Sequence, residues 1–342
     1  MSPKGSTKQV PTRDKLLPGL SSHEVSFRFD SINPGCEVLG EEFAFGKESI
    51  MLPLKPGMRV ALVCPCGRPN APRVVQGMAV LTDWGLLPQA GPVCKAYLEG
   101  RGPLGDLDYL AASDEERLSE LRWALTSPDV DACWVVRGGY GLGRVISSLC
   151  LDESERPVFG FSDATVLLHA LVQRGWTSVV HAANVQSLST LSPAALKATK
   201  NLVLGGQFPN LRGQWLRQGE AVGALWGGNL CVLASLCGSR VVVGSRPGIL
   251  FLEDINEAPY RLDRMLNQLS EAGAFEDLQG VALGSFSECG NLSQLLSHWV
   301  PRWNVPVLAE LPVGHTCDNF PLWLGQEVRM AQSQISRVSK SI

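Results

Sequence analysis

The stretch PVFGFSDATVLLHALVQRG, residues 157–175, decides the fold of this chain. Residues 158–161 form a short apolar run that is typical of a buried parallel strand. Residues 164–172 form a longer apolar run of good helix formers, and Gly175 is placed to end that helix. The strand therefore passes into the helix through a turn that contains Ser162 and Asp163.

Two interpretations of this turn are open. At the carboxyl edge of an open α/β sheet, a serine beside the N-terminal amides of a helix lies where such sheets bind ligands and stabilise anions. The same arrangement of strand, turn and helix forms a nucleophile elbow. Serine and aspartate are also good N-cap residues, so capping is the commoner explanation of Ser162 and Asp163 when this segment is taken alone.

Strands and helices also alternate upstream of this stretch. The predicted strands are residues 59–64, 93–98 and 132–136. The predicted helices are residues 73–84, 113–125 and 144–150. This alternation predicts a parallel, doubly wound α/β sheet.

A glycine-rich loop, RGGYGLG at residues 137–143, follows the predicted strand 132–136. Its position is that of a dinucleotide-binding turn, but its spacing is G-x-G-x-G, and Arg144 occupies the third glycine position of that fingerprint. The loop is therefore better explained as a tight turn whose exposed backbone N–H groups can serve an oxyanion.

The chain divides into four predicted segments. Residues 1–52 have few periodic apolar positions and are expected to be a poorly ordered extension. Residues 53–185 form the predicted N-terminal α/β domain, and residues 186–219 a linker, because Gly, Pro and Trp dominate its second half. Residues 220–342 form the predicted C-terminal domain.

The composition excludes several classes of protein. The chain has 342 residues, of which 45% are hydrophobic and 18% charged, an ordinary globular balance. The net charge of −3 provides no basic surface for nucleic acid or for a membrane. No apolar run approaches the roughly 18 residues of a membrane span. The first 20 residues lack the continuous apolar core of an export signal, so we expect a cytoplasmic location.

The chain contains ten cysteines. Without an export signal, and in a chain of this length, we expect them to be reduced thiols rather than disulfides. Cys64 and Cys66 are the closest approach to a zinc-binding spacing and have no matching pair, so no metal site is predicted.

Three polar residues follow predicted apolar strands or lie beside them, namely Ser162, Glu253 and His315. Acyl transfer needs a nucleophile, a base that accepts its proton, and a carboxylate that holds the base in one tautomer. These residue types can fill the three roles. Glu253 can equally be a strand-end carboxylate paired with Arg261, and His315 a histidine satisfied within a turn, so the residue types alone leave the triad open.

Five motifs together resemble the LD-carboxypeptidase family of serine peptidases, which also includes microcin immunity proteins. They occur in the order RGGYG (137–141), GFSDAT (160–165), GGNL (227–230), LFLEDINEAPYRLDRML (250–266) and PVGH (312–315). The similarity covers residues 55–328. It implies a flavodoxin-like N-terminal α/β domain, a C-terminal domain with a β-rich core, and an active site in the cleft between them.

The resemblance also implies roles for individual residues. Ser162 matches the nucleophile, and Glu253 and His315 match its partners in a Ser-Glu-His triad. The backbone N–H groups of Gly139 and Asp163 match the oxyanion hole. No metal and no cofactor is required.

The implied reaction releases a terminal D-amino acid, D-alanine, from the tetrapeptide of muropeptides during cell-wall recycling. The partner is therefore a small peptide or muropeptide, and a homodimer is also expected. The substrate's terminal carboxylate needs a cation, which Arg137 or Arg261 can supply.

Four positions depart from the family pattern. They are Cys66, where the family's first loop usually has serine, Ala182 and Ala183, where the family often has glycine and proline, and Thr316, where glycine often follows the histidine. They affect the expected specificity more than the mechanism. Within the family, hydrolysis of a toxic peptide–nucleotide conjugate is the alternative.

Outside the family, the alternatives are an α/β-hydrolase esterase and a nucleotide- or anion-binding module. The esterase elbow requires G-x-S-x-G, and Ala164 replaces its final glycine.

Overall fold

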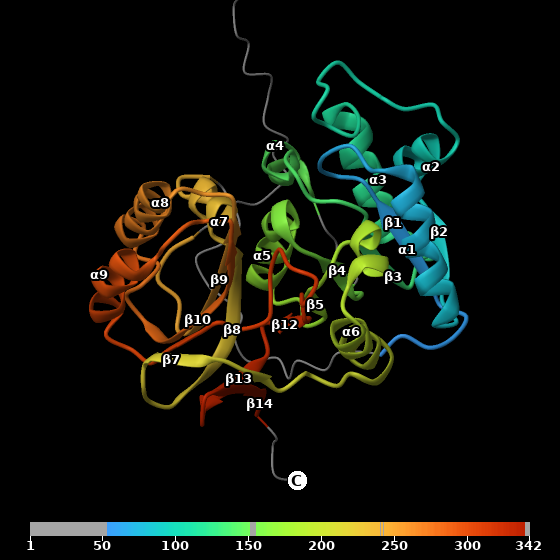
Figure 1. The fold of residues 1–342 in the computed structure, drawn as a ribbon. Helices are drawn as coiled ribbons and strands as arrows, with labels where there is room; N and C mark the ends of the chain where they lie inside the picture. Colours follow the sequence, from blue (N-terminus) through green and yellow to red (C-terminus); the bar gives the residue numbers. More distant parts are fainter. Residues whose placement is uncertain (1–52, 151–154, 240, 242, 339–342) are drawn as a thin grey trace, which may run out of the picture. The chain divides into compact units, whose positions relative to one another are not determined.

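The computed structural model describes residues 53–150, 155–239, 241 and 243–338 (Figure 1). The extension predicted for residues 1–52 lies outside this part of the chain. None of the helices in the described ranges combines the length and hydropathy needed to cross a membrane.

The first sheet confirms the predicted parallel α/β architecture. Its strands are β1 (Arg59–Val63), β2 (Leu87–Ala90), β3 (Ala132–Val135), β4 (Val158–Gly160), β5 (Val179–His181) and β12 (Leu322–Leu324). Strands β2, β1, β3, β4 and β5 are neighbours in that order and parallel, which is the flavodoxin-like order, and β12 joins β5 antiparallel. The order reverses between β1 and β3, so a ligand site is expected at the carboxyl ends of these strands.

Helices and short 3-10 turns connect these strands. They are α1 (Ala71–Asp83), α2 (Pro92–Leu98), α3 (Asp114–Thr126), α4 (Leu142–Val145), η1 (Ile146–Ser148), η2 (Ser162–Ala164), α5 (Thr165–Gln173), η3 (Val185–Thr190) and α6 (Pro193–Gly205). Helix α3 begins with a capping box, in which Ser113 Oγ accepts from the Glu116 N–H at 3.3 Å and Glu116 Oε2 accepts from the Ser113 N–H at 3.1 Å. This satisfies two N–H groups that the helix itself leaves unpaired.

The prediction of a strand at residues 93–98 is wrong, because this segment is helix α2 and the second strand is β2. Pro92 occupies the first turn, where its missing N–H is harmless. The buried carboxylate of Glu120 accepts from the Cys94 N–H at 3.0 Å, so an acidic group stabilises the start of the helix. Burial raises the pKa of Glu120 to about 7, although the hydrogen bonds that its carboxylate accepts from backbone N–H groups oppose the rise.

A second, eight-stranded sheet follows. Its strands are β6 (Leu211–Arg212), β7 (Gln214–Arg217), β8 (Ala221–Asn229), β9 (Gly248–Ile255), β10 (Leu278–Ser287), β11 (Val307–Ala309), β13 (Glu327–Ala331) and β14 (Gln334–Arg337). Strands β8, β9, β10 and β11 are parallel neighbours, and the outer strands pair antiparallel. The helices of this part are α7 (Leu230–Leu236), α8 (Pro259–Glu271) and α9 (Ser293–Trp303).

The second half of the predicted linker differs from its prediction. Residues 207–219 contain β6 and β7, which pair with β14 and β11 of the second sheet. Strand β12 also departs from the predicted division into an N-terminal and a C-terminal domain, because it lies late in the chain and pairs with β5 of the first sheet. Short edge strands of mixed polarity carry little periodic signal, so pairing partners far along the chain decide their structure.

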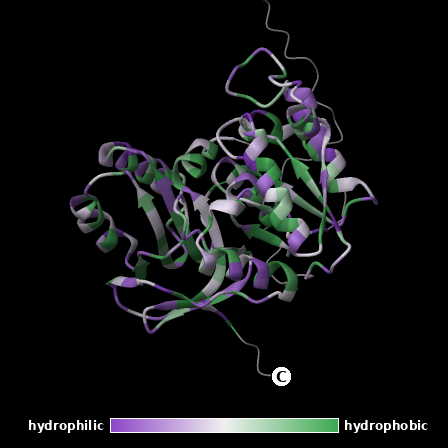
Figure 2. Cartoon of the chain, turned by 45° about the vertical axis from the view of Figure 1, so that its right-hand side comes forward, coloured by the Kyte–Doolittle hydropathy of each residue, from purple (hydrophilic) through white to green (hydrophobic). Residues whose placement is uncertain are grey.

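The central strands of both sheets are buried on both faces. Residues 60–63 of β1 and residues 249–252 of β9 have no exposed surface, as expected for parallel strands covered by helices. Figure 2 shows hydrophobic residues concentrated along the strands of the first sheet. These rigid strands hold the polar residues that follow them in fixed positions.

Candidate active site

Ser162 lies in a strained turn, two residues after the end of β4. Its φ is 64°, a left-handed conformation that residues other than glycine rarely adopt. Gly138 makes room for it, because a Cβ at that position would lie 2.9 Å from the Ser162 Oγ. Strain of this kind collects at functional sites, where surrounding structure holds it in place.

Capping does not explain Ser162 and Asp163. Neither η2 nor α5 has a side-chain cap hydrogen bond. The Asp163 carboxylate instead accepts from the Leu142 N–H at 3.0 Å, at the start of α4. The turn is therefore tied to the glycine-rich loop that follows β3.

The backbone of the glycine-rich loop lies against the serine turn. The Gly67 N–H donates to the Gly138 carbonyl at 3.0 Å. Because a trans peptide directs its C=O and its following N–H to opposite sides, the Gly139 N–H points away from Gly67. A Cβ on Gly138 would also lie 3.3 Å from the Asp163 backbone nitrogen. The structure therefore places the two predicted oxyanion residues, Gly139 and Asp163, close to Ser162.

Glu253 and His315 are in direct contact. His315 Nδ1 lies 2.7 Å from Glu253 Oε2, and the Glu253 side chain is fully buried. The other carboxylate oxygen accepts from Asn229 Nδ2 at 3.2 Å. Gly314 permits this approach, since a Cβ there would lie 2.8 Å from Glu253 Oε2. His315 therefore keeps its Nε2 for another partner.

The electrostatic surroundings of His315 favour its protonated form. Burial alone would lower the pKa of His315, but the hydrogen bond to Glu253 and the charges of Glu253 and Asp254 outweigh it and raise the pKa. Burial also raises the pKa of Asp254 to about 6. A base with these neighbours accepts a proton readily.

Contacts from the serine turn reach both of the other residues. The Phe161 ring lies 4.7 Å from the His315 ring, between centroids. Thr165 Oγ1 accepts from the Asn229 N–H at 3.2 Å, and Asn229 in turn binds Glu253. Among these described residues, no hydrogen bond joins the Ser162 hydroxyl to the His315 ring. Catalytic hydrogen bonds are often long or poorly aligned before substrate binds.

Three further residues of the site were not assigned from the sequence. Asn229 and Asp254 lie inside quoted motifs but received no role. Asn229 Nδ2 donates to both Glu253 and Asp254, and Asp254 Oδ2 accepts from the Cys231 N–H. His181 is fully buried between the rings of Phe161 and Phe251, and burial lowers its pKa to about 4. His181 therefore packs as a neutral ring beside the site.

The two arginines proposed for the substrate carboxylate differ in their surroundings. Arg137 is exposed, directly precedes Gly138, and donates to the Arg68 carbonyl. Arg261 is exposed on the first turn of α8 and lies 3.5 Å from the Glu257 carboxylate. Among the described residues, no carboxylate lies within ion-pair distance of Arg137.

A pocket of about 390 Å³ adjoins His315. It is lined by residues from both sequence halves: Phe161, Ala183, Ser187, Thr190, Leu191, Ile255, His315, Thr316, Cys317 and Asn319. Its lining is apolar or uncharged apart from the histidine. The pocket can therefore hold a neutral part of a substrate, but it offers no arginine or lysine to a carboxylate.

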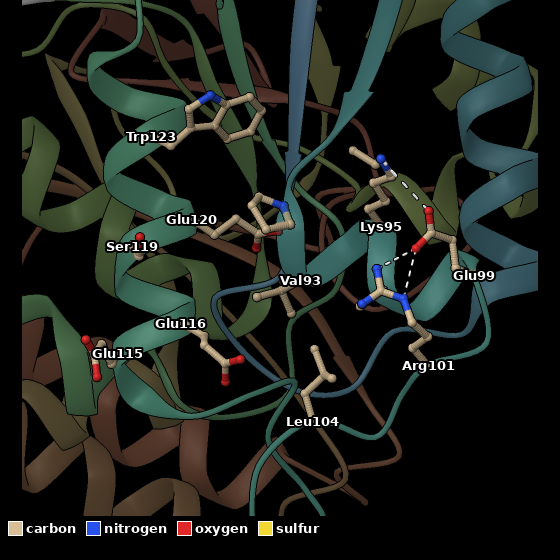
Figure 3. Close-up of a pocket in the computed structure, with 13 residues that line it drawn as sticks. Val93, Lys95, Glu99, Arg101, Leu104, Glu115, Glu116, Ser119, Glu120 and Trp123 are labelled. Atoms are coloured by element: carbon tan, nitrogen blue, oxygen red, sulfur yellow. Dashed lines mark hydrogen bonds and ion pairs between the residues drawn. The ribbon is translucent and has the colours of Figure 1, made fainter.

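A larger pocket of about 820 Å³ lies between α2 and α3 (Figure 3). Arg101 pairs there with Glu99, and Lys95 lies 3.9 Å from the same carboxylate. None of the predicted site residues lines it. Its size therefore does not make it the active site, because the nucleophile, acid and base candidates lie elsewhere.

Comparison with known proteins agrees with this arrangement. The family model for the LD-carboxypeptidase N-terminal domain matches residues 60–182, and that for the C-terminal domain matches residues 222–330. A protein of Synechocystis sp. that carries the provisional name carboxypeptidase is 30% identical over 82% of this chain and 93% of its own length. The murein tetrapeptide carboxypeptidase of Pseudomonas aeruginosa is 36% identical over 65% of this chain and 80% of its own length.

Solved structures show the same fold. The muramoyltetrapeptide carboxypeptidase of Oxalobacter formigenes has a TM-score of 0.71 and 30% identity, covering 83% of this chain and 100% of that one. The protein MccF, solved with glutamyl sulfamoyl guanosine, has a TM-score of 0.70 at 18% identity, covering 85% of this chain and 99% of that one. With both domain models and relatives that span most of its length, the chain belongs to the LD-carboxypeptidase family of peptidases.

Proposed function

We propose that this protein is a serine-type LD-carboxypeptidase that releases D-alanine from muropeptide tetrapeptides. The observation that carries the proposal is the Glu253–His315 pair, 2.7 Å apart, beside a serine held at a φ of 64°. The names of the Pseudomonas and Oxalobacter relatives support the tetrapeptide as substrate. We also propose a cytoplasmic location, a reducing compartment in which thiols such as Cys64, Cys66 and Cys94 stay reduced.

In the proposed first step, Ser162 Oγ attacks the carbonyl carbon of the bond that precedes D-alanine, and its proton passes to His315 Nε2. Glu253 fixes the tautomer, because its carboxylate binds Nδ1 and leaves Nε2 as the acceptor. The negative charge that forms on the carbonyl oxygen is stabilised by the N–H groups of Gly139 and Asp163.

In the second step, the imidazolium donates its proton to the D-alanine amine and the peptide bond breaks, leaving an acyl ester on Ser162. Water then gives a proton to His315 and attacks this ester, and the serine leaves with a proton returned from the imidazolium. His315 takes part in every proton transfer in this sequence.

We propose Arg137 rather than Arg261 as the partner of the terminal carboxylate. Arg137 is joined to Gly138, which packs against Ser162, so its side chain leaves the backbone beside the serine turn. Arg261 already has the Glu257 carboxylate within 3.5 Å. A carboxypeptidase needs such a cation because only the last residue of a chain carries this carboxylate.

Arg137→Ala should raise KM for the tetrapeptide by roughly 10- to 100-fold, about the effect of losing one charge-assisted hydrogen bond. Arg261→Ala serves as the matched control and should change KM by no more than about 2-fold. Steady-state kinetics with the tetrapeptide and with its C-terminal amide measure this. The amide should be a poor substrate for the wild type and equally poor for Arg137→Ala. A normal KM for Arg137→Ala would exclude the assignment.

The alternative substrate class is an aminoacyl nucleotide conjugate, which the MccF neighbours suggest through fold alone. Parallel incubations with the muropeptide tetrapeptide and with glutamyl sulfamoyl guanosine separate the two. We expect the tetrapeptide to lose D-alanine and the conjugate to remain intact. Cleavage of the conjugate alone would overturn the proposed substrate while keeping the catalytic residues.

A further inference from the structure

Arg117 of α3 is a fully buried arginine whose partners are mainly backbone carbonyls. Its Nε donates to the Ala112 carbonyl at 3.2 Å, and its Nη1 donates to the Gly141 carbonyl at 3.0 Å and to the Pro65 carbonyl. Its Nη2 pairs with Asp114, a partly exposed carboxylate. Burying a guanidinium is unfavourable unless its donors are satisfied, so this arrangement is specific.

Two of the three carbonyls that Arg117 binds belong to the two loops of the switch point. Pro65 follows β1, and Gly141 follows β3. These are also the loops joined by the hydrogen bond from Gly67 to Gly138, which directs the Gly139 N–H. Arg117 thus binds both loops at the place where the predicted oxyanion hole forms.

The far end of the glycine-rich loop is held from two sides. Arg117 binds the carbonyl of Gly141, and Asp163 binds the N–H of the next residue, Leu142. A Cβ on Gly141 would lie 2.7 Å from Arg117 Nη1, so the loop packs directly on the guanidinium. The positive charge of Arg117 also opposes the rise in pKa that burial imposes on Asp163.

We propose that Arg117 is a positioning residue for the oxyanion hole, acting by fixing the loops after β1 and β3 relative to the serine turn. The proposal rests on the proposed serine mechanism. A lysine cannot replace it, because a single ammonium lacks the planar fork that reaches three carbonyls in fixed directions. Loss of the fork should therefore move the Gly139 N–H without removing any group that touches substrate.

The chain provides a matched control in Arg156. This arginine is also buried, and its Nη1 donates to the carbonyls of Ala124, Ser127 and Val130 at 3.3, 2.8 and 2.7 Å. It lies just before β4, so it is at the opposite end of this strand from the serine turn. Arg156→Lys thus perturbs a buried arginine of the same chemistry away from the site.

The test compares Arg117→Lys with Arg156→Lys in the full chain, after circular dichroism and melting temperature have shown both variants to be folded. Arg117→Lys should lower kcat for D-alanine release by roughly 10- to 100-fold with KM within about 2-fold, because the interaction is made in the transition state. Arg156→Lys should lower the melting temperature and leave kcat unchanged. Unchanged kcat in Arg117→Lys, or equal losses in the two variants, would overturn the proposal.

A second readout separates this proposal from the choice of substrate. A fluorophosphonate reacts with an activated serine through a charged oxygen that occupies the oxyanion hole. The wild type and Arg156→Lys should label at Ser162 at the same rate, and Arg117→Lys more slowly, whether or not the tetrapeptide is cleaved. Equal labelling rates in all three would refute the role of Arg117.

If Arg117→Lys does not fold, Asp114→Asn gives the answer, since it removes the carboxylate partner of Arg117 at a partly exposed position. We expect a several-fold slower labelling of Ser162. An unchanged labelling rate in Asp114→Asn would count against the proposal.

Discussion

Ser162→Ala should lower the rate of D-alanine release by at least ~10⁴-fold, since removing the nucleophile of a triad disables the whole unit. The alanine keeps the Cβ that packs against Gly138 and faces the same backbone constraint at a φ of 64°. The variant should therefore fold like the wild type. Product release followed by chromatography, on proteins with matching circular dichroism spectra, measures the effect.

Ser297→Ala is a suitable control for this experiment. Ser297 lies on α9, is exposed, and is outside the pocket beside His315. It should keep the wild-type rate. Turnover by Ser162→Ala at the wild-type rate would remove the serine from the mechanism.

Glu253→Gln should lower kcat by roughly 10²- to 10⁴-fold, because the amide favours the wrong imidazole tautomer while keeping the shape of the side chain. The contact at stake is the 2.7 Å approach of Glu253 Oε2 to His315 Nδ1. Because Glu253 is fully buried between Asn229 and His315, the variant also tests whether the protein still folds with a neutral side chain at this position. Folding is checked by thermal unfolding before the kinetics are interpreted.

The pH profile gives the same residue a second test. The proposed mechanism needs neutral His315, so kcat/KM should rise with pH through the pKa of His315, which lies above its ordinary value. Burial lowers this pKa, and Glu253 is the main group that raises it. The midpoint should therefore move to lower pH in Glu253→Gln. An identical midpoint in the two proteins would contradict the assignment of His315 as the base.

Much of this fold follows from local sequence. The apolar run and turn at residues 157–175 predict a strand, a sharp turn and a helix, and the structure confirms them as β4, η2 and α5. The capping box at Ser113 and the apolar strand at residues 249–252 are local signals of the same kind. Such signals succeed because the apolar pattern or the cap that specifies each element lies within the element itself.

The remaining features depend on contacts distant in sequence. Helix α2 was missed because the carboxylate that stabilises its first turn, Glu120, comes from α3. Strands β6 and β7 form only because β14 and β11 provide partners more than 80 residues away. Arg117 gave no signal, since an arginine in a helix is ordinary until the loops that surround it are known.

The candidate site, like the fold, could be predicted from the sequence only in part. The residue types Ser162, Glu253 and His315 and the motifs around them predict a triad, but their meeting cannot be read from spacing. The structure joins Glu253 to His315 and brings the serine turn against them through Phe161 and Thr165. The structure explains why Gly228 of the GGNL motif is a glycine, because a Cβ at this position would lie 2.6 Å from Thr165 Oγ1.

The most direct test of the proposed activity is mass spectrometry of the products from two tetrapeptides that differ only in the configuration of the terminal alanine. Wild-type protein, with a chelator present, should remove D-alanine from the L,D-linked tetrapeptide and leave its terminal L-alanine diastereomer intact. An uncleaved L,D-tetrapeptide, or equal cleavage of the two diastereomers, would contradict an LD-carboxypeptidase activity.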